Sequence, residues 1–117
     1  MERASQTTFH KISEVLNAPT ISPSDGVWLE RNFLFDCVIH AVILPGINVG
    51  DFLDFDLHVE GTGEFFTRFK VTEDHLNRGI NWPLQYSIVA GALRRVEVKY
   101  RVEASGELSP SGIYTTK

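Results

Sequence analysis

The sequence predicts an all-β protein, a single sandwich of two antiparallel sheets, and two observations support that expectation. Apolar and polar residues alternate over residues 53–60 and again over residues 65–71, so each run would bury one of its faces. Gly61-Thr62-Gly63 lies between the runs, and a glycine turn that joins two alternating runs is typical of an antiparallel hairpin. The chain has 117 residues, the length of one domain.

The first 17 residues differ from the rest of the chain. Phe9, Ile12 and Leu16 have helical spacing, and the following Asn17-Ala18-Pro19 ends the segment. We expect residues 1–17 to form a short helix or a frayed arm. This arm would either pack across an open end of the sandwich or serve to dock a partner. The β-sandwich domain would then cover residues 18–117.

Seven strands are expected after the arm, at residues 20–30, 33–44, 51–60, 64–72, 84–89, 95–103 and 108–114. Ser24-Asp25-Gly26 places a turn or kink inside the first strand. Residues 73–79 resemble a single helical turn, with Thr72 as the N-cap and Gly79 at the C-terminal end. The last strand contains Pro110, so we expect it at the edge of a sheet. Seven strands at this spacing are typical of an immunoglobulin-like antiparallel β-sandwich.

The composition narrows the classes of function. The formal charge is −4 and the basic residues are scattered, so nucleic-acid binding is disfavoured. No apolar run is long enough to span a membrane, and the N-terminus lacks the apolar segment of a secretory signal. We therefore expect a cytoplasmic protein, with export by a route that needs no cleaved signal left open.

No pattern of residues indicates catalysis. Cys37 is the single cysteine and lies in an apolar run, so a small buried side chain is expected rather than a reactive thiol. The four histidines have no metal-ligand spacing, and the sequence has no Gly-x-Ser-x-Gly elbow. A spatial triad stays formally open, because triads are not read from sequence. We expect neither an enzyme nor a cofactor.

Acidic residues line one face of the expected third strand, where Asp54, Asp56, His58 and Glu60 alternate with apolar residues. The carboxylate oxygens of Asp54, Asp56 and Glu60 would suit calcium. Side chains two residues apart on a strand are about 6.5–7 Å apart, however, and the sequence has no calcium-loop spacing. We therefore expect a solvated outer face, partly neutralised by ion pairs with Arg68 and Lys70 of the next strand, and no metal site.

Three aromatic side chains are candidates for binding. Phe52 and Phe66 fall on the faces that carry Asp54, Asp56 and Arg68. They either point toward solvent or a partner, or tuck under a loop or the arm. Trp82, expected in a loop, would either stack on a sugar or plug the end of the sandwich.

The order of several short motifs resembles a bacterial immunoglobulin-like repeat found in large surface-exposed and toxin-associated proteins. The matching features are Ala18-Pro19-Thr20-Ile21, the turn from Pro45-Gly46 to Val49-Gly50-Asp51, the Gly61-x-Gly63 hairpin, Val71-Thr72 followed by Asp74 and Gly79, Pro83-Leu84, the alternating Val96, Val98, Tyr100 and Val102, Gly106, and Ser109-Pro110-Ser111. The resemblance implies a non-catalytic spacer, adhesive surface or partner-binding module. Such repeats usually occur in tandem, whereas this chain is a single unit starting at a methionine, so binding is favoured over spacing.

We therefore expect a non-catalytic interaction module that binds a protein partner or self-associates, for example as a homodimer. It would act through strand addition at the seventh or first strand, or through the Phe52 and Phe66 face. The predicted binding residues are Phe52, Phe66, Asp54, Asp56, Arg68 and Trp82. The alternative is a lectin-like module for carbohydrate or another cell-surface ligand, in which Trp82 and Tyr86 stack on sugars and the acidic face holds calcium.

Overall fold

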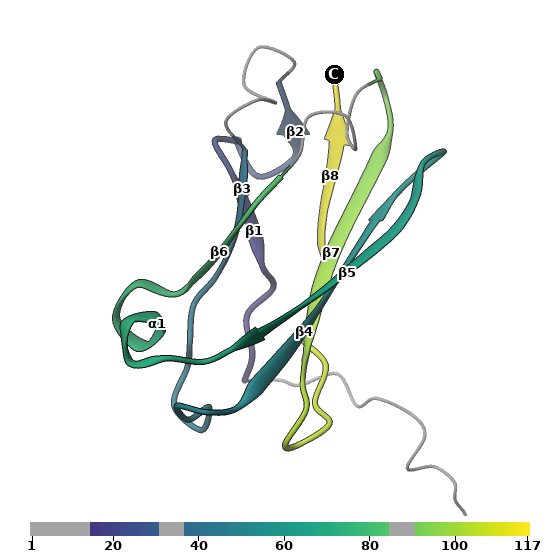
Figure 1. Ribbon diagram of the computed structural model, residues 1–117. Coiled ribbons are helices and arrows are strands. Elements are labelled where there is room, and N and C mark those ends of the chain that lie inside the picture. Colours follow the sequence, from purple (N-terminus) through teal and green to yellow (C-terminus); the bar gives the residue numbers. More distant parts are fainter. Residues whose placement is uncertain (1–14, 31–36, 85–90) are drawn as a thin grey trace, which may run out of the picture.

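A computed structural model describes residues 15–30, 37–84 and 91–117 (Figure 1). Most of the expected arm, residues 31–36 and residues 85–90 lie outside this description. The described elements, in chain order, are β1 (Thr20–Ser22), β2 (Trp28–Leu29), β3 (Val38–Ala41), β4 (Phe52–Val59), β5 (Gly63–Lys70), α1 (Glu73–Arg78), β6 (Ile80–Pro83), β7 (Arg95–Val102) and β8 (Gly112–Thr116). None of the helices in these ranges is long and apolar enough to cross a membrane.

Two sheets pack against each other around one core, and the all-β prediction is confirmed. One sheet has the strand order β1-β3-β6 and the other the order β2-β8-β7-β4-β5 (Figure 1). Both sheets contribute fully buried side chains to the core, including Ile39 and Ile80 from the first and Leu57, Val98 and Tyr100 from the second. Burial of apolar area from two facing sheets is the main stabilising term for such a fold.

The predicted hairpin forms β4 and β5, and β4 is a central strand of the larger sheet. It pairs antiparallel with β5 on one side and with β7 on the other. Its inward residues, Leu53, Phe55, Leu57 and Val59, are at most 1% exposed, as the alternation in the sequence predicts. The polar residues between them therefore point to the opposite side of the sheet. We call the solvent-facing side of β5, β4 and β7 the outer face.

The predicted helical turn is α1, which carries the chain from the larger sheet to the smaller one (Figure 1). Thr72 is its N-cap and forms a capping box with His75, which satisfies backbone donors that the first turn leaves unpaired. Gly79 ends the helix with a φ of 77°, a conformation that favours glycine. The local sequence therefore determines where this helix begins and ends.

The expected first strand is two strands in different sheets, so the described residues hold eight strands rather than seven. Within the kink, the Asp25 carboxylate accepts hydrogen bonds from the backbone N–H groups of Val27 (2.9 Å) and Trp28 (2.8 Å). This turn redirects the chain from β1 to β2. Because β2 then runs parallel to β8, the larger sheet is mixed and the prediction of a purely antiparallel fold was wrong.

The prediction for the last strand was also wrong. β8 begins after Pro110, at Gly112, so the proline does not interrupt its ladder. β8 lies between β7 and β2 in the strand order, so it is not the edge strand that the proline predicted, and β2 pairs with its last two residues. The predicted fifth strand, residues 84–89, lies almost entirely outside the described residues, and β6 precedes it.

Three further residues bear on the sequence predictions. Leu16, in the expected arm, is 6% exposed and belongs to the core. Its neighbour Val15 is exposed. Cys37 is buried, in agreement with its interpretation as a small apolar residue.

Candidate functional site

The structure brings five of the six predicted binding residues together on the outer face. Phe52, Asp54 and Asp56 project from β4, and Phe66 and Arg68 project from the adjacent β5. Their order follows from the register, in which Asp54 pairs with Arg68 and Asp56 pairs with Phe66. The outer face is therefore the candidate site, and its central polar feature is the Asp54 carboxylate.

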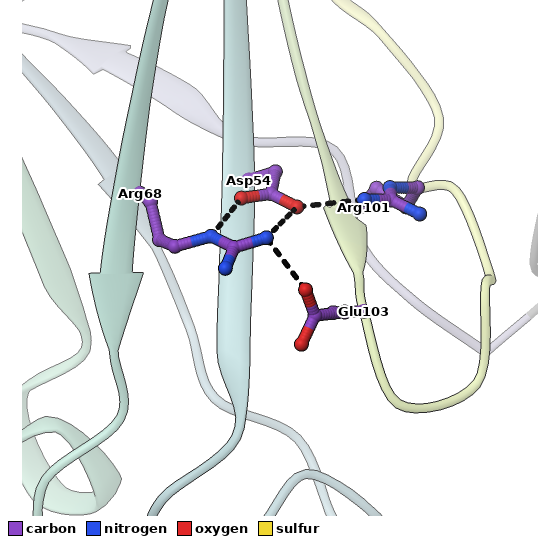
Figure 2. Close-up of polar contacts among 4 residues, drawn as sticks. All are labelled: Asp54, Arg68, Arg101 and Glu103. Carbon is purple, nitrogen blue, oxygen red and sulfur yellow. Dashed lines mark hydrogen bonds and ion pairs between the residues drawn. The ribbon is translucent and has the colours of Figure 1, made fainter.

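Asp54 holds two guanidinium groups from the strands on either side of it (Figure 2). Arg68 on β5 donates to both of its carboxylate oxygens, at 2.7 and 3.1 Å, and Arg101 on β7 donates at 2.8 Å. Arg68 also donates to Glu103 at 2.6 Å. These charge-assisted bonds connect three neighbouring strands and fix the direction of the Arg68 side chain.

Asp56 lies one outward position further along β4 and has a different environment. The strand register places Phe66 and Lys99 on either side of it, where Asp54 has two arginines. One Asp56 carboxylate oxygen is buried and has no hydrogen-bond partner among the described residues. The outer face therefore carries one carboxylate with several strong bonds and one with an unsatisfied oxygen.

The pKa values of the two carboxyl groups are shifted in opposite directions. Hydrogen bonds from Arg68, and then from Arg101, hold the pKa of Asp54 below its ordinary value. Burial raises the pKa of Asp56, and the neighbouring Glu64 carboxylate raises it further. Asp54 thus stabilises the fold in its charged form, whereas the fold disfavours the charge on Asp56.

The two predicted aromatic residues are exposed to different extents. Phe52 is partly buried, and the guanidinium carbon of Arg68 lies 4.9 Å from its ring centroid as a cation–π contact. Phe66 is 71% exposed, the largest value among the exposed large apolar side chains of the described residues. Phe66 is therefore the aromatic residue of this face that is available to a partner.

A shallow groove of about 740 Å³ runs over the outer face. Its described lining residues are Asp54, Phe55, Asp56, Phe66, Thr67, Arg68, Lys99, Tyr100, Arg101 and Leu108. Three cationic and two acidic side chains line it, so the groove is mixed in charge rather than acidic. Lys99, Arg101 and Glu103 were not predicted as site residues, although the alternation along residues 95–103 places them outward.

Trp82, the sixth predicted residue, lies apart from the others. It projects from β6 toward the space between the sheets, where its ring packs edge-on to Phe55 with centroids 6.2 Å apart. Tyr86, its expected partner in sugar stacking, lies outside the described residues. Within the ranges that the structure describes, no three His, Cys, Asp or Glu side chains gather as a metal site.

Among the residues that the structure describes, β5 forms the edge of the larger sheet, since its neighbour in the strand order is β4 alone. Its eight residues alternate between exposed outer-face side chains and half-buried inward ones. On the inward side lies a second hollow of about 420 Å³, beside β5 and the edge strand β6. Its described lining residues include Phe65, Thr67, Trp82 and Leu84.

No family model matches this chain, and no curated protein matches it. The geometry of the outer face and of β5 is therefore the basis for a proposal about function.

Proposed function

We propose that this protein is a non-catalytic interaction module, an immunoglobulin-like sandwich that binds a protein partner or a second copy by adding a strand to the free edge of β5. The observation that carries the proposal is an eight-residue edge strand with a 71% exposed phenylalanine, Phe66. Unpaired backbone groups along an edge form hydrogen bonds with an added strand, and the side chains select which strand is added.

The lengths of the edge strands favour β5 over the alternatives. Within residues 15–30, 37–84 and 91–117, the other edge strands of the two sheets are β1, β2 and β6, with three, two and four described residues. β6 also contains Pro83, which has no backbone N–H to donate. Short edges, prolines and charged side chains are means by which proteins prevent strand addition; β5 is long and has no proline, but it carries the charged Glu64, Arg68 and Lys70.

The side chains of β5 supply further contacts for a partner. Phe66 projects to the outer face beside the groove, and Phe65 and Thr67 line the hollow on the inward side. An added strand would therefore meet Phe66 among charged side chains on the outer face and an apolar surface on the inward face. Glu64, Arg68 and Lys70 restrict the strands that fit, because like charges directly opposite each other are destabilising.

Site-specific photo-crosslinking tests this proposal. A benzophenone amino acid replaces Phe66 in one variant and Ile113 in the other. Ile113 is a matched control because it is exposed on the same sheet but lies on β8, where it pairs with Glu97 of β7. We expect adducts from position 66, either with a second copy or with another protein, that excess unlabelled protein suppresses. Equal adducts from both positions, or none from position 66, would contradict strand addition at β5.

A further inference from the structure

We propose, on the basis of the function above, that the partner of β5 is β5 of a second copy. The two strands pair antiparallel about a twofold axis at Phe66. This pairing would join the two five-stranded sheets into one continuous ten-stranded sheet. A twofold interface uses the same surface on both copies, so the strand must be complementary to itself.

The outer-face side chains of β5 have this self-complementarity. Glu64, Phe66 and Arg68 are consecutive outward residues, with opposite charges at equal distances from the phenylalanine. When Phe66 faces Phe66 of the second copy, Glu64 faces Arg68 of the second copy, and the reverse pair forms by symmetry. Two ion pairs then flank an aromatic cross-strand pair, and both kinds of pair stabilise antiparallel sheets.

The inward side chains also fit this register. Phe65 faces Thr67 of the second copy, and Phe69 faces Gly63 of the second copy, so each large side chain meets a small one. The hollow beside Thr67, lined also by Trp82 and Leu84, provides apolar surface next to the incoming Phe65. Alternating large and small residues at facing positions is the arrangement that packs without voids.

Neighbouring registers fit less well. A twofold axis at Arg68 or at Glu64 places like charges opposite each other. An axis at Thr67 retains an opposite-charge pair, Glu64 with Lys70, but it places Phe65 against Phe69 on the inward side. It also places Arg68 opposite Phe66, so neither the Phe66–Phe66 pair nor the Glu64–Arg68 pair forms. Among the axes at Glu64, Phe66, Thr67 and Arg68, the Phe66 axis is the one that satisfies both faces.

The two charged side chains differ in how far they are already engaged. Arg68 is held in place by Asp54, Glu103 and the ring of Phe52, so little side-chain entropy is lost when it meets a partner. Glu64 makes no ion pair with any described residue. The Glu64 carboxylate on this edge strand is therefore available to pair with the Arg68 guanidinium of a second copy.

Charge reversal in separate and mixed samples tests the pairing. Arg68→Glu places two acidic residues opposite each other in a homodimer, and Glu64→Arg places two basic residues opposite each other. We expect each variant to dimerise at least about tenfold more weakly than the wild type in light scattering. An equimolar mixture should form heterodimers, because both cross-strand pairs are again of opposite charge. If the mixture stays monomeric where the wild type is dimeric, the proposed pairing is wrong.

Cysteine cross-linking tests the register without disturbing Arg68. Cα atoms of directly opposed antiparallel residues lie about 4.5–5.5 Å apart, within disulfide range. Phe66→Cys should therefore form a disulfide-linked dimer under mild oxidation. Lys70→Cys, an exposed control on the same strand, should not, since the two copies of residue 70 would be about 27 Å apart. Cross-linking through Thr67→Cys in place of Phe66→Cys would overturn the register.

The self-pairing and the proposed function fail in different ways. A wild type that stays monomeric at all concentrations, yet forms a photo-adduct with another protein from position 66, overturns the self-pairing and retains strand addition at β5. The absence of any adduct from position 66 overturns both. A wild-type dimer that does not depend on residues 64, 66 and 68 overturns the self-pairing and assigns the dimer to another surface.

Discussion

Replacing each of two aspartates on the same face of β4 by asparagine should affect the free energy of unfolding differently. Asp54→Asn removes the charge that receives hydrogen bonds from Arg68 and Arg101. The Asp54 side chain is 27% exposed, so its pairs are partly solvated. Ion pairs at exposed sites contribute about 0.2–1 kcal/mol each, and two pairs predict a loss of about 0.4–2 kcal/mol in the free energy of unfolding.

Asp56→Asn should leave the free energy of unfolding unchanged or increase it at neutral pH. The fold disfavours this charge through burial and through Glu64, and one oxygen of the carboxylate has no partner among the described residues. Urea unfolding of both variants at one low protein concentration measures the difference. Loss of stability in Asp56→Asn equal to or greater than that in Asp54→Asn would refute this interpretation of the outer face.

The pH dependence separates the two residues further. The folded pKa of Asp54 lies below its unfolded value, so its stabilisation is present above the ordinary carboxyl pKa and is lost as the pH falls through the folded value. The destabilising difference between Asp54→Asn and wild type should therefore shrink in acid. For Asp56 the folded pKa is raised, so the cost of its charge applies above that pKa and disappears as the pH falls.

Two further pairs of variants test the core and the turns. Tyr114→Phe should lower the free energy of unfolding by about 1–3 kcal/mol, because the Tyr114 hydroxyl accepts a 2.9 Å hydrogen bond from the buried Ile21 N–H. Tyr100→Phe should lower it little, because the buried Tyr100 hydroxyl has no hydrogen-bond partner among the described residues. Equal losses in thermal melts would contradict this. Gly79→Ala should destabilise the fold more than Gly106→Ala. Both glycines have a φ near 75°, so the backbone strain of a substitution is similar at the two positions. A Cβ at Gly79 would lie 2.6 Å from the Ala41 carbonyl oxygen, whereas nothing lies within 4 Å of a Cβ at Gly106. Equal melting temperatures for the two variants would disprove a close approach at Gly79.

The elements that the sequence predicts well are those with local causes. The β4–β5 hairpin follows from alternation and a glycine turn, and α1 follows from the Thr72 cap and Gly79. The parallel pairing of β2 with β8 was not predictable in this way, because residues 28 and 115 meet only in the folded chain. Pro110 indicated an edge strand, but it lies before β8 begins, and strand boundaries are the least certain feature of a sequence pattern.

The side chains of the candidate site were predicted in part, because strand alternation is also a local pattern. Alternation places Asp54, Asp56 and Arg68 on the outer face, which the structure confirms. The contrast between the two aspartates depends on β7, whose register sets Arg101 beside Asp54 and Lys99 beside Asp56. That register is a long-range property, so the sequence pattern did not distinguish the two carboxylates.

Hydrogen–deuterium exchange tests most directly whether two copies pair through the free edge of β5. Amide exchange is measured by mass spectrometry at several protein concentrations, and peptides covering β5 (Gly63–Lys70) are compared with peptides covering the interior strand β8 (Gly112–Thr116). Self-pairing predicts that the β5 amides become protected as the concentration rises, while β8 does not change. Protection that rises instead at β1 or β6, with β5 unchanged, would contradict the claim.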